Sequence, residues 1–408
     1  MGAPVTCTPL GDLRGVYNGS VISFRAVPFA EPPMGERRFA AAEPVRPWKG
    51  LREAQEHGPI APQLPSRLRV AMGDFARPQS ENCLTLTINA PAVDANRRPV
   101  LVWLHGGAWV TGAGSLDWYD GARLAREGDI VCVGVNYRLG ALGWLHRPGI
   151  VDADAGISDM VTALAWVRDN IAAFGGDPNC VTVMGQSAGA TSIARLLMLP
   201  EARVLFNRAI MQSGGYGRGA YTSAMASERA DQFLRLLGID PQAGDALARL
   251  RAVEVPRLLA AQTELAQRNA RFAYPGAMFM PVFPAAMNLP EMLSAVAEGA
   301  DDKPLLIRRC RILRGKLCYA ASVVNKRWRV IVPNGLGRAL WMCSPIWLQM
   351  KRFCGRRWNW RGRSRDGAAL PMRMCSIGRR RRRRSARATA SSCRSCSARW
   401  MRGQMRQC

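Results

Sequence analysis

The chain has 408 residues, 48% of them hydrophobic, and a formal net charge of +27. This length can bury one large hydrophobic core or two smaller ones. The late apolar stretch at 330–350 contains Pro333, Pro345 and Arg338, which argues against a membrane span.

Charge and cysteine content both change after Ile307. Residues 308–408 hold 28 basic residues and one acidic residue, Asp366, whereas residues 1–307 hold 29 of each sign. Eight of the 12 cysteines also lie in 308–408, and the four scattered through the rest do not suggest a disulfide framework. We expect a domain at 1–307 and an Arg/Cys/Trp-rich tail at 308–408. Without a signal-peptide pattern, a reducing, cytoplasmic location is expected.

The first 307 residues alternate strand-like runs with helical patterns, which is typical of an α/β sheet. A β-hairpin is expected at the start of the chain, followed by buried strands at 99–107 and 129–138. A helix is predicted at 157–176, a strand at 179–185, a helix from 188 that ends before Pro200, and a strand at 206–215. The pattern at 222–268 is helical and amphipathic.

The segment "VTVMGQSAGA" (181–190) places Ser187 between Gly185 and Gly189, after an expected strand and before an expected helix. This is the pattern of a nucleophile elbow, in which the two glycines allow close backbone approach. The positive end of the helix and the N–H of Ala188 would then face an oxyanion formed at the serine.

A second glycine-rich segment, "WLHGGAWVTGAGSLDWYDG" (103–121), follows an expected strand upstream of the elbow. The small residues Gly106, Gly107 and Ala108 would let backbone amides point at the same oxygen as the Ala188 amide. Its alternative interpretation, a plain glycine-rich turn, is disfavoured by the elbow that follows.

Several further motifs resemble the type-B carboxylesterases, an α/β-hydrolase family that includes the cholinesterases, and the similarity runs through most of residues 8–307. The motifs are "RAVPFAEPPMGERRF" (25–39), "SENCLTLTI" (80–88), "NYRLGALGWL" (136–145), "WVRDNIAAFGGDPNC" (166–180) and "RAIMQSG" (208–214). The resemblance implies an α/β-hydrolase fold with a doubly wound, mostly parallel sheet. Because the motifs stop near Ile307, we expect that fold to be incomplete at its C-terminal end and followed by a basic, irregular tail.

The resemblance also implies site residues and partners. It makes Ser187 the nucleophile and the backbone amides of Gly107, Ala108 and Ala188 the oxyanion hole. It implies a structural ion pair between Arg38 and Glu81. Small carboxylic esters are the expected substrates, and no cofactor or metal is expected.

One departure from the family concerns a disulfide bond. In disulfide-bonded members, a cysteine at the position of Ala61 pairs with the one that matches Cys83. With alanine at position 61, Cys83 is expected to be free, as in the intracellular, bacterial branch of the family.

The acid and the histidine of the catalytic triad are not identified. In α/β-hydrolases they follow the serine in the order acid, then histidine. No Asp or Glu occurs between Asp302 and Asp366, and no histidine follows Ser187. His105 at the start of the glycine-rich loop is expected to serve packing, while His57 and His146 are expected at the surface. The triad acid and base therefore stay unknown, and we expect impaired activity.

The coincident changes at Ile307 suggest a cause at the level of the gene. Out-of-frame reading of GC-rich DNA yields Arg, Ala, Ser, Cys and Trp, and we hypothesise a frameshift after about codon 307. Alternatively, the run Arg379–Arg384 could bind nucleic acid or act as a localisation signal, and Cys393 and Cys396 could begin a zinc site. No binding fold organises these residues, so only non-specific binding of polyanions is expected.

The sequence therefore predicts a carboxylic ester hydrolase that acts through an acyl-serine intermediate. The alternative is a non-catalytic binding protein or pseudoenzyme with a polybasic tail. The intact elbow at Ser187 favours the esterase, because binding alone does not need a serine between two glycines.

Overall fold

The computed structural model describes residues 2–66, 77–152, 154–214, 221–270, 279–283, 294–296, 298–300, 303–313 and 316–324, with backbone only from Ile307 onward. The chain divides into two compact units, Met1–Arg357 and Trp358–Cys408. All described residues lie in the first unit. No helix in this described part is both long enough and apolar enough to cross a membrane.

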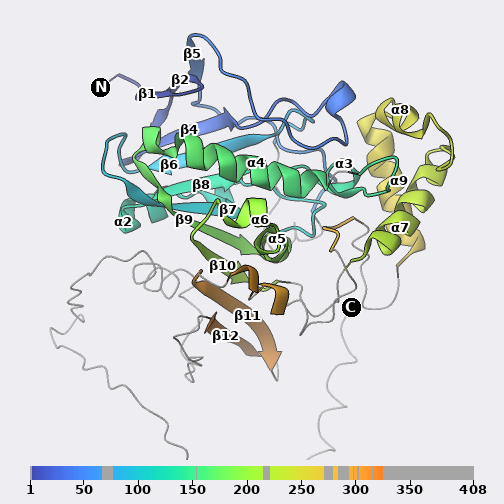
Figure 1. Ribbon diagram of the computed structural model, residues 1–408. Helices are drawn as coiled ribbons and strands as arrows, with labels where there is room; N and C mark the ends of the chain where they lie inside the picture. The colour runs from blue at the N-terminus through green and yellow to red at the C-terminus, as the bar shows by residue number, and fades with distance from the viewer. Residues whose placement is uncertain are drawn as a thin grey trace, which may run out of the picture. The chain divides into compact units, whose positions relative to one another are not determined.

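The main sheet of the described part has the strand order β12-β11-β10-β9-β7-β8-β6-β4-β3 (Figure 1). Its five consecutive strands from β11 to β8 are parallel, whereas β6, β4, β3 and β12 join antiparallel at the two sides. The strands are β3 (Val16–Asn18), β4 (Val21–Pro28), β6 (Thr85–Ala90), β7 (Arg98–Leu104), β8 (Val131–Val135), β9 (Gly176–Gln186), β10 (Arg208–Gln212), β11 (Leu305–Leu313) and β12 (Lys316–Val324). A separate small sheet contains β1 (Val5–Thr8), β2 (Gly11–Arg14) and β5 (Leu51–Glu53), of which β1 and β2 form the expected hairpin.

The central strands are apolar on both faces because helices cover both faces of the sheet. Val181 and Val183 on β9 belong to the larger hydrophobic cluster, which includes residues of α4 (Ala155–Asn170) and α5 (Ala188–Leu197). Their neighbour Met184 points the opposite way, into a smaller cluster with Ala125 of α2 (Ala122–Gly128). This two-layer burial explains the continuous apolar runs of these strands.

The other helices follow the expected amphipathic patterns. The region at 222–268 forms α7, α8 and α9, which lie together at one end of the sheet (Figure 1). Their bounds, with those of the two short helices α3 and α6, are α3 (Gly140–Trp144), α6 (Pro200–Arg203), α7 (Ser223–Leu236), α8 (Ala246–Arg251) and α9 (Val255–Arg268). Short 3₁₀ turns lie at η1 (Gly35–Arg37), η2 (Asp117–Tyr119) and η3 (Ile171–Phe174).

The described part differs from expectation just after Ile307, where an irregular tail was expected. Strand β11 runs on to Leu313 and pairs antiparallel with β12, in a register that joins Leu305 to Val324. This pairing satisfies backbone groups that would otherwise form an open edge next to β10. The expected division at residue 307 stays a prediction, and the arginine run and the Cys393/Cys396 pair lie outside the described residues.

Candidate active site

Ser187 occupies a sharp turn between β9 and α5. Its backbone has φ 53° and ψ −114°, which is unusual for a residue with a side chain. The Ser187 N–H donates to the carbonyl of Gln212 on β10 at 2.8 Å, and its own carbonyl accepts from the Thr191 N–H at 3.0 Å. These bonds hold the strained residue at the carboxyl end of the central strands, where open α/β sheets place their ligands.

Two glycines make this turn possible. A Cβ atom on Gly185 would lie 2.6 Å from the carbonyl carbon of Gly189, and one on Gly189 would lie 2.7 Å from the carbonyl oxygen of His105. Contacts this short are not tolerated between non-bonded atoms, so both positions require glycine. The spacing that indicated an elbow in the sequence therefore has a steric cause.

The glycine-rich loop after β7 lies against the elbow. A Cβ atom on Gly106 would be 2.9 Å from the carbonyl oxygen of Gln186 and 3.4 Å from Cβ of Ser187. The next three residues, Gly107, Ala108 and Trp109, all have positive φ values, of 121°, 55° and 60°. A chain that turns back in this way can direct successive amides to one side.

A side-chain hydrogen bond joins this loop to helix α5. The indole Nε1–H of Trp109 donates to Oγ of Ser192 on α5 at 3.0 Å, with both residues buried. Ala188 is the first residue of α5, so its N–H has no acceptor within the helix and lies at the positive end of the helix dipole. The elbow and the loop therefore form one unit, within which the amides of Gly107, Ala108 and Ala188 are the predicted oxyanion donors.

His105 is a buried packing residue of this unit. Its ring stacks on Tyr137 with the centroids 4.1 Å apart, and its Nδ1 lies 2.7 Å from the Gly106 carbonyl oxygen. The Tyr137 hydroxyl donates to the His105 carbonyl at 2.7 Å. Burial lowers the pKa of His105 to about 4. A neutral ring stacked and bonded in this way fixes the start of the loop.

Neither of the other two histidines is bonded to Ser187 among the described residues. Nε2 of His146 lies 3.0 Å from Oγ of Ser223, and burial lowers the His146 pKa. Burial, with the charges of Arg77 and Arg25, lowers the pKa of His57 to about 4. Both rings are half-buried, whereas we expected them at the surface.

Among the described residues, the Ser187 hydroxyl has no hydrogen-bond partner, and no histidine or carboxylate is bonded to it. The same part of the chain contains no group of three or more His, Cys, Asp or Glu side chains that could hold a metal ion. Among the described residues the site therefore contains the predicted nucleophile and the predicted backbone donors, while the base and its acid partner are not assigned.

Arg38 and Glu81 lie in direct contact. Nε of Arg38 donates to Oε2 of Glu81 at 2.7 Å, and Nη2 bonds the other carboxylate oxygen. The second terminal nitrogen of Arg38 donates to the carbonyls of Arg251 and Val253, at 2.7 and 2.6 Å. The pair thus ties the N-terminal region to the connection between α8 and α9. Cys83, two residues after Glu81, is buried and free, with Ala61 also buried.

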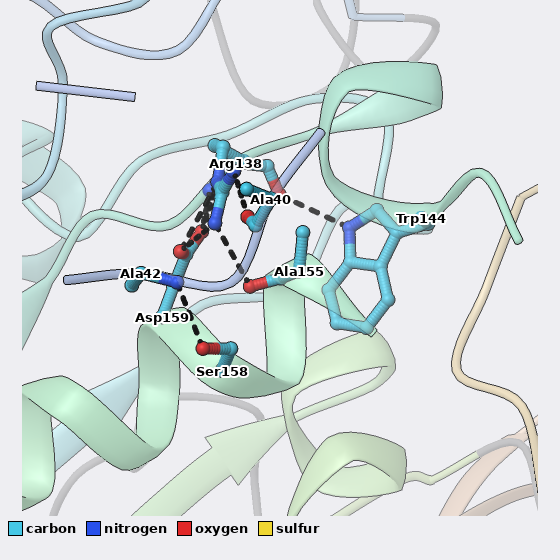
Figure 2. A network of polar contacts seen from close by, with 7 residues as sticks. All are labelled: Ala40, Ala42, Arg138, Trp144, Ala155, Ser158 and Asp159. Carbon is cyan, nitrogen blue, oxygen red and sulfur yellow. Dashed lines mark hydrogen bonds and ion pairs between the residues drawn. The ribbon is translucent and has the colours of Figure 1, made fainter. Parts of the chain in front are cut away.

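A second ion pair, which the sequence reasoning missed, is more deeply buried. Arg138 and Asp159 expose 4% and 0% of their side chains, and Nη2 of Arg138 donates to Oδ1 of Asp159 at 2.6 Å (Figure 2). The same guanidinium donates to the carbonyls of Ala40 and Ala155, at 2.8 and 3.4 Å. One signal was available, because Asp159 lies on the apolar side of its helix beside Met160, where a carboxylate needs a partner.

Most of the chain is similar in sequence to one protein family. The model of the carboxylesterase family matches residues 2–307. The chain is 42% identical over 285 residues to phenmedipham hydrolase of Pseudarthrobacter oxydans, covering 69% of this chain and 56% of the relative. It is 40% identical over 313 residues to para-nitrobenzyl esterase of Bacillus subtilis (strain 168), covering 75% and 62%. The chain thus spans less than two thirds of the length of these relatives.

Solved structures give the same result. A thermophilic PNB esterase superimposes with a TM-score of 0.69 at 37% identity, covering 76% of this chain and 64% of that chain. A carboxylesterase of Geobacillus stearothermophilus superimposes with a TM-score of 0.65 at 40% identity, covering 74% and 60%. The chain therefore has the α/β-hydrolase fold and belongs to the type-B carboxylesterase family.

Proposed function

We propose that this chain cleaves small carboxylic esters through an acyl intermediate on Oγ of Ser187. One observation carries the proposal: Ser187 sits in a strained turn at the N-terminus of α5, directly against the Gly106–Gly107 loop. Relatives whose names describe ester or related hydrolysis, such as para-nitrobenzyl esterase, support the same reaction class.

The reaction assigns a role to each part of this unit. Oγ attacks the acyl carbon, and the carbonyl oxygen becomes an oxyanion that accepts hydrogen bonds from the amides of Gly107, Ala108 and Ala188. Collapse of this intermediate expels the alcohol, and water then releases the carboxylic acid from Ser187. A general base must take the serine proton and return it to the departing alkoxide.

The expected turnover rate depends on whether a general base is available to Ser187. In a serine hydrolase, loss of the serine or the histidine lowers kcat by roughly 10⁶. Because no described histidine is bonded to Ser187, we predict slow turnover by this chain. The experiment is hydrolysis of p-nitrophenyl acetate by the wild-type chain and by Ser187→Ala. We expect a low rate that the substitution abolishes, and an unchanged rate in Ser187→Ala would contradict the proposal.

We further propose that the reading frame changes near codon 307. The loss of family motifs and the appearance of 28 basic residues beyond Ile307 support this. Sequencing of the gene around this codon tests it. A single-base change that restores a glycine-plus-acid segment and a later histidine is expected, and its absence in every frame would contradict the proposal.

The cysteines and the arginine run support proposals about location and partners. We propose a reducing, cytoplasmic compartment, which the four free cysteines of the described part support (Cys7, Cys83, Cys132 and Cys180). Binding of polyanions by the arginine run should be non-specific and salt-dependent. Titration with heparin at 50 mM and 200 mM salt would measure it, with much weaker binding expected at the higher concentration.

A further inference from the structure

A buried side-chain amide holds the far end of the glycine-rich loop. Gln63 lies in the N-terminal region, and only 4% of the residue is exposed. Its Oε1 accepts hydrogen bonds from the Gly112 N–H at 2.6 Å and from Oγ1 of Thr111 at 2.8 Å. Its Nε2 donates to the carbonyls of Gly112 and Ala61, both at 3.0 Å.

These four bonds use the full capacity of the side chain. A primary amide has two N–H donors and an oxygen with two acceptor positions, and all four have partners here. Gly112 is held through both its N–H and its carbonyl by this one side chain. The main-chain N–H of Gln63 donates to Oε1 of Gln79 at 2.8 Å, which holds the Gln63 backbone in place. The side-chain bonds of Gln63 to Thr111 and Gly112 are called the Gln63 clamp below.

The clamped residues pack on the start of the loop, next to the nucleophile. A Cβ atom on Gly112 would lie 2.7 Å from Nδ1 of His105 and 2.8 Å from the carbonyl oxygen of Gly106. Thr111 is equally close to Gly107. A Cβ atom added to Gly107 would lie 2.8 Å from the Thr111 carbonyl carbon. Movement of Thr111 or Gly112 would therefore shift the Gly106–Gly107 backbone.

Backbone hydrogen bonds within the turn also connect Thr111 to Gly107. The Gly107 carbonyl accepts the N–H groups of Val110 and Thr111, both at 3.1 Å. This carbonyl belongs to the peptide whose N–H is that of Ala108, a proposed oxyanion donor. Anchoring Thr111 therefore sets the orientation of that peptide plane, since the carbonyl and the N–H of one peptide point in opposite directions.

We propose that Gln63 is a positioning residue for the oxyanion hole, which rests on the proposed function of the Ser187 site. Its amide fixes Thr111 and Gly112, and through them the Gly107–Ala108 peptide. Oxyanion donors are effective only when they are held in place before the charge develops. A displacement of about 1 Å can lower a rate by about 10².

The test compares Gln63→Met, which keeps the length of the side chain and loses all four side-chain bonds, with a matched control. The control is Gln55→Met, because the Gln55 amide also bonds a backbone carbonyl, that of Gly15 at 3.2 Å, in a region outside the loop. Each full-length variant is treated with a fluorophosphonate, and labelling at Ser187 is followed over time at several reagent concentrations. Amide hydrogen exchange of the segment 103–116 is measured in parallel.

We expect Gln63→Met to lower the maximal labelling rate constant by about 10² with little change in the half-saturating concentration. Exchange in 103–116 should become faster, and Gln55→Met should match the wild type in both measurements. If Gln63 only stabilises the fold, folded Gln63→Met should instead keep the wild-type labelling rate constant.

Thr111→Val is the milder second variant if Gln63→Met does not fold, because it removes a single bond of the Gln63 clamp. It should slow labelling several-fold and speed exchange in the loop. Wild-type labelling and exchange in a folded variant would overturn the role of Gln63. Absence of labelling at Ser187 in the wild-type chain would instead overturn the proposed function, and the role of Gln63 with it.

Discussion

Gly189 on helix α5 is in backbone contact with Leu104 at the end of strand β7. A Cβ atom at position 189 would overlap the Leu104 carbonyl oxygen and lie 2.8 Å from its carbonyl carbon. Helix α5 can therefore approach β7 this closely only with glycine at position 189. This approach is what brings the glycine-rich loop after β7 beside Ser187.

Replacing Gly189 with alanine should therefore be costly. Because the added methyl group meets backbone atoms, the strand or the helix must move, and Gly189→Ala should lower the free energy of unfolding by about 3 kcal/mol. Urea denaturation measures this. The matched control is Gly244→Ala, where a Cβ atom meets nothing within 4 Å, and it should change stability by less than about 1 kcal/mol. Equal midpoints for the two variants would contradict the close packing at Gly189.

The backbone strain at Ser187 should appear as a difference in the free energy of unfolding between two variants. A residue with a side chain at φ 53° and ψ −114° costs about 1–3 kcal/mol relative to a relaxed conformation, and glycine relieves most of this cost. Ser187→Gly should thus be about 1 kcal/mol more stable than Ser187→Ala, which keeps the Cβ atom. Chemical denaturation of both variants tests the difference. If Ser187→Ala is the more stable of the two, the turn is not strained.

His105 should make stability depend on pH. Its pKa is about 4 in the folded protein, against an unperturbed value of about 6.5, because burial disfavours the charged ring. Between these two pH values the unfolded chain therefore binds more protons than the folded protein. The contribution of His105 to the free energy of unfolding is fully present above pH 6.5 and is lost as the pH falls toward 4. The loss approaches about 3 kcal/mol.

His105→Gln isolates this contribution. Asp154, whose buried carboxyl has a pKa raised to about 7, has the opposite pH dependence in the same range. The difference between the wild type and His105→Gln cancels Asp154, and it should shrink steadily as the pH falls from 6.5 to 4. His57→Gln is the control, with a smaller effect in the same direction because that ring is half exposed. A difference that is flat with pH would rule out a buried, neutral His105.

The buried pair of Arg138 and Asp159 should be sensitive to removal of one charge. Asp159→Asn leaves a guanidinium with 4% exposure without its counter-charge and should cost about 3–5 kcal/mol. Asp169→Asn breaks the exposed pair with Arg168, whose two side chains are more than half exposed, and should cost less than about 1 kcal/mol. Thermal unfolding of both variants tests this contrast, and similar losses would show that burial of the first pair carries no special weight.

The elbow could be predicted from the sequence because its requirements are local. The positions of Gly185 and Gly189 relative to Ser187 are set by contacts within the turn and with one adjacent strand. The strands were predictable for a related reason, since their continuous apolar runs reflect burial on both faces of the sheet.

Contacts that depend on the tertiary fold were not predictable in this way. Gln63 reaches Gly112 across 49 positions of the chain, and nothing near either residue indicates the partner. The pairing of β11 with β12 was also missed, because the basic composition after Ile307 gives no regular pattern of apolar residues.

The reactivity of Ser187 tests the proposed ester cleavage most directly. The decisive measurement is treatment of the full chain with a fluorophosphonate, followed by peptide mass spectrometry, with Ser187→Ala as the control. We expect a phosphonyl adduct on Ser187 that is absent from the variant. Lack of an adduct at Ser187 in the folded wild-type chain, or equal labelling of the variant, would contradict the proposal.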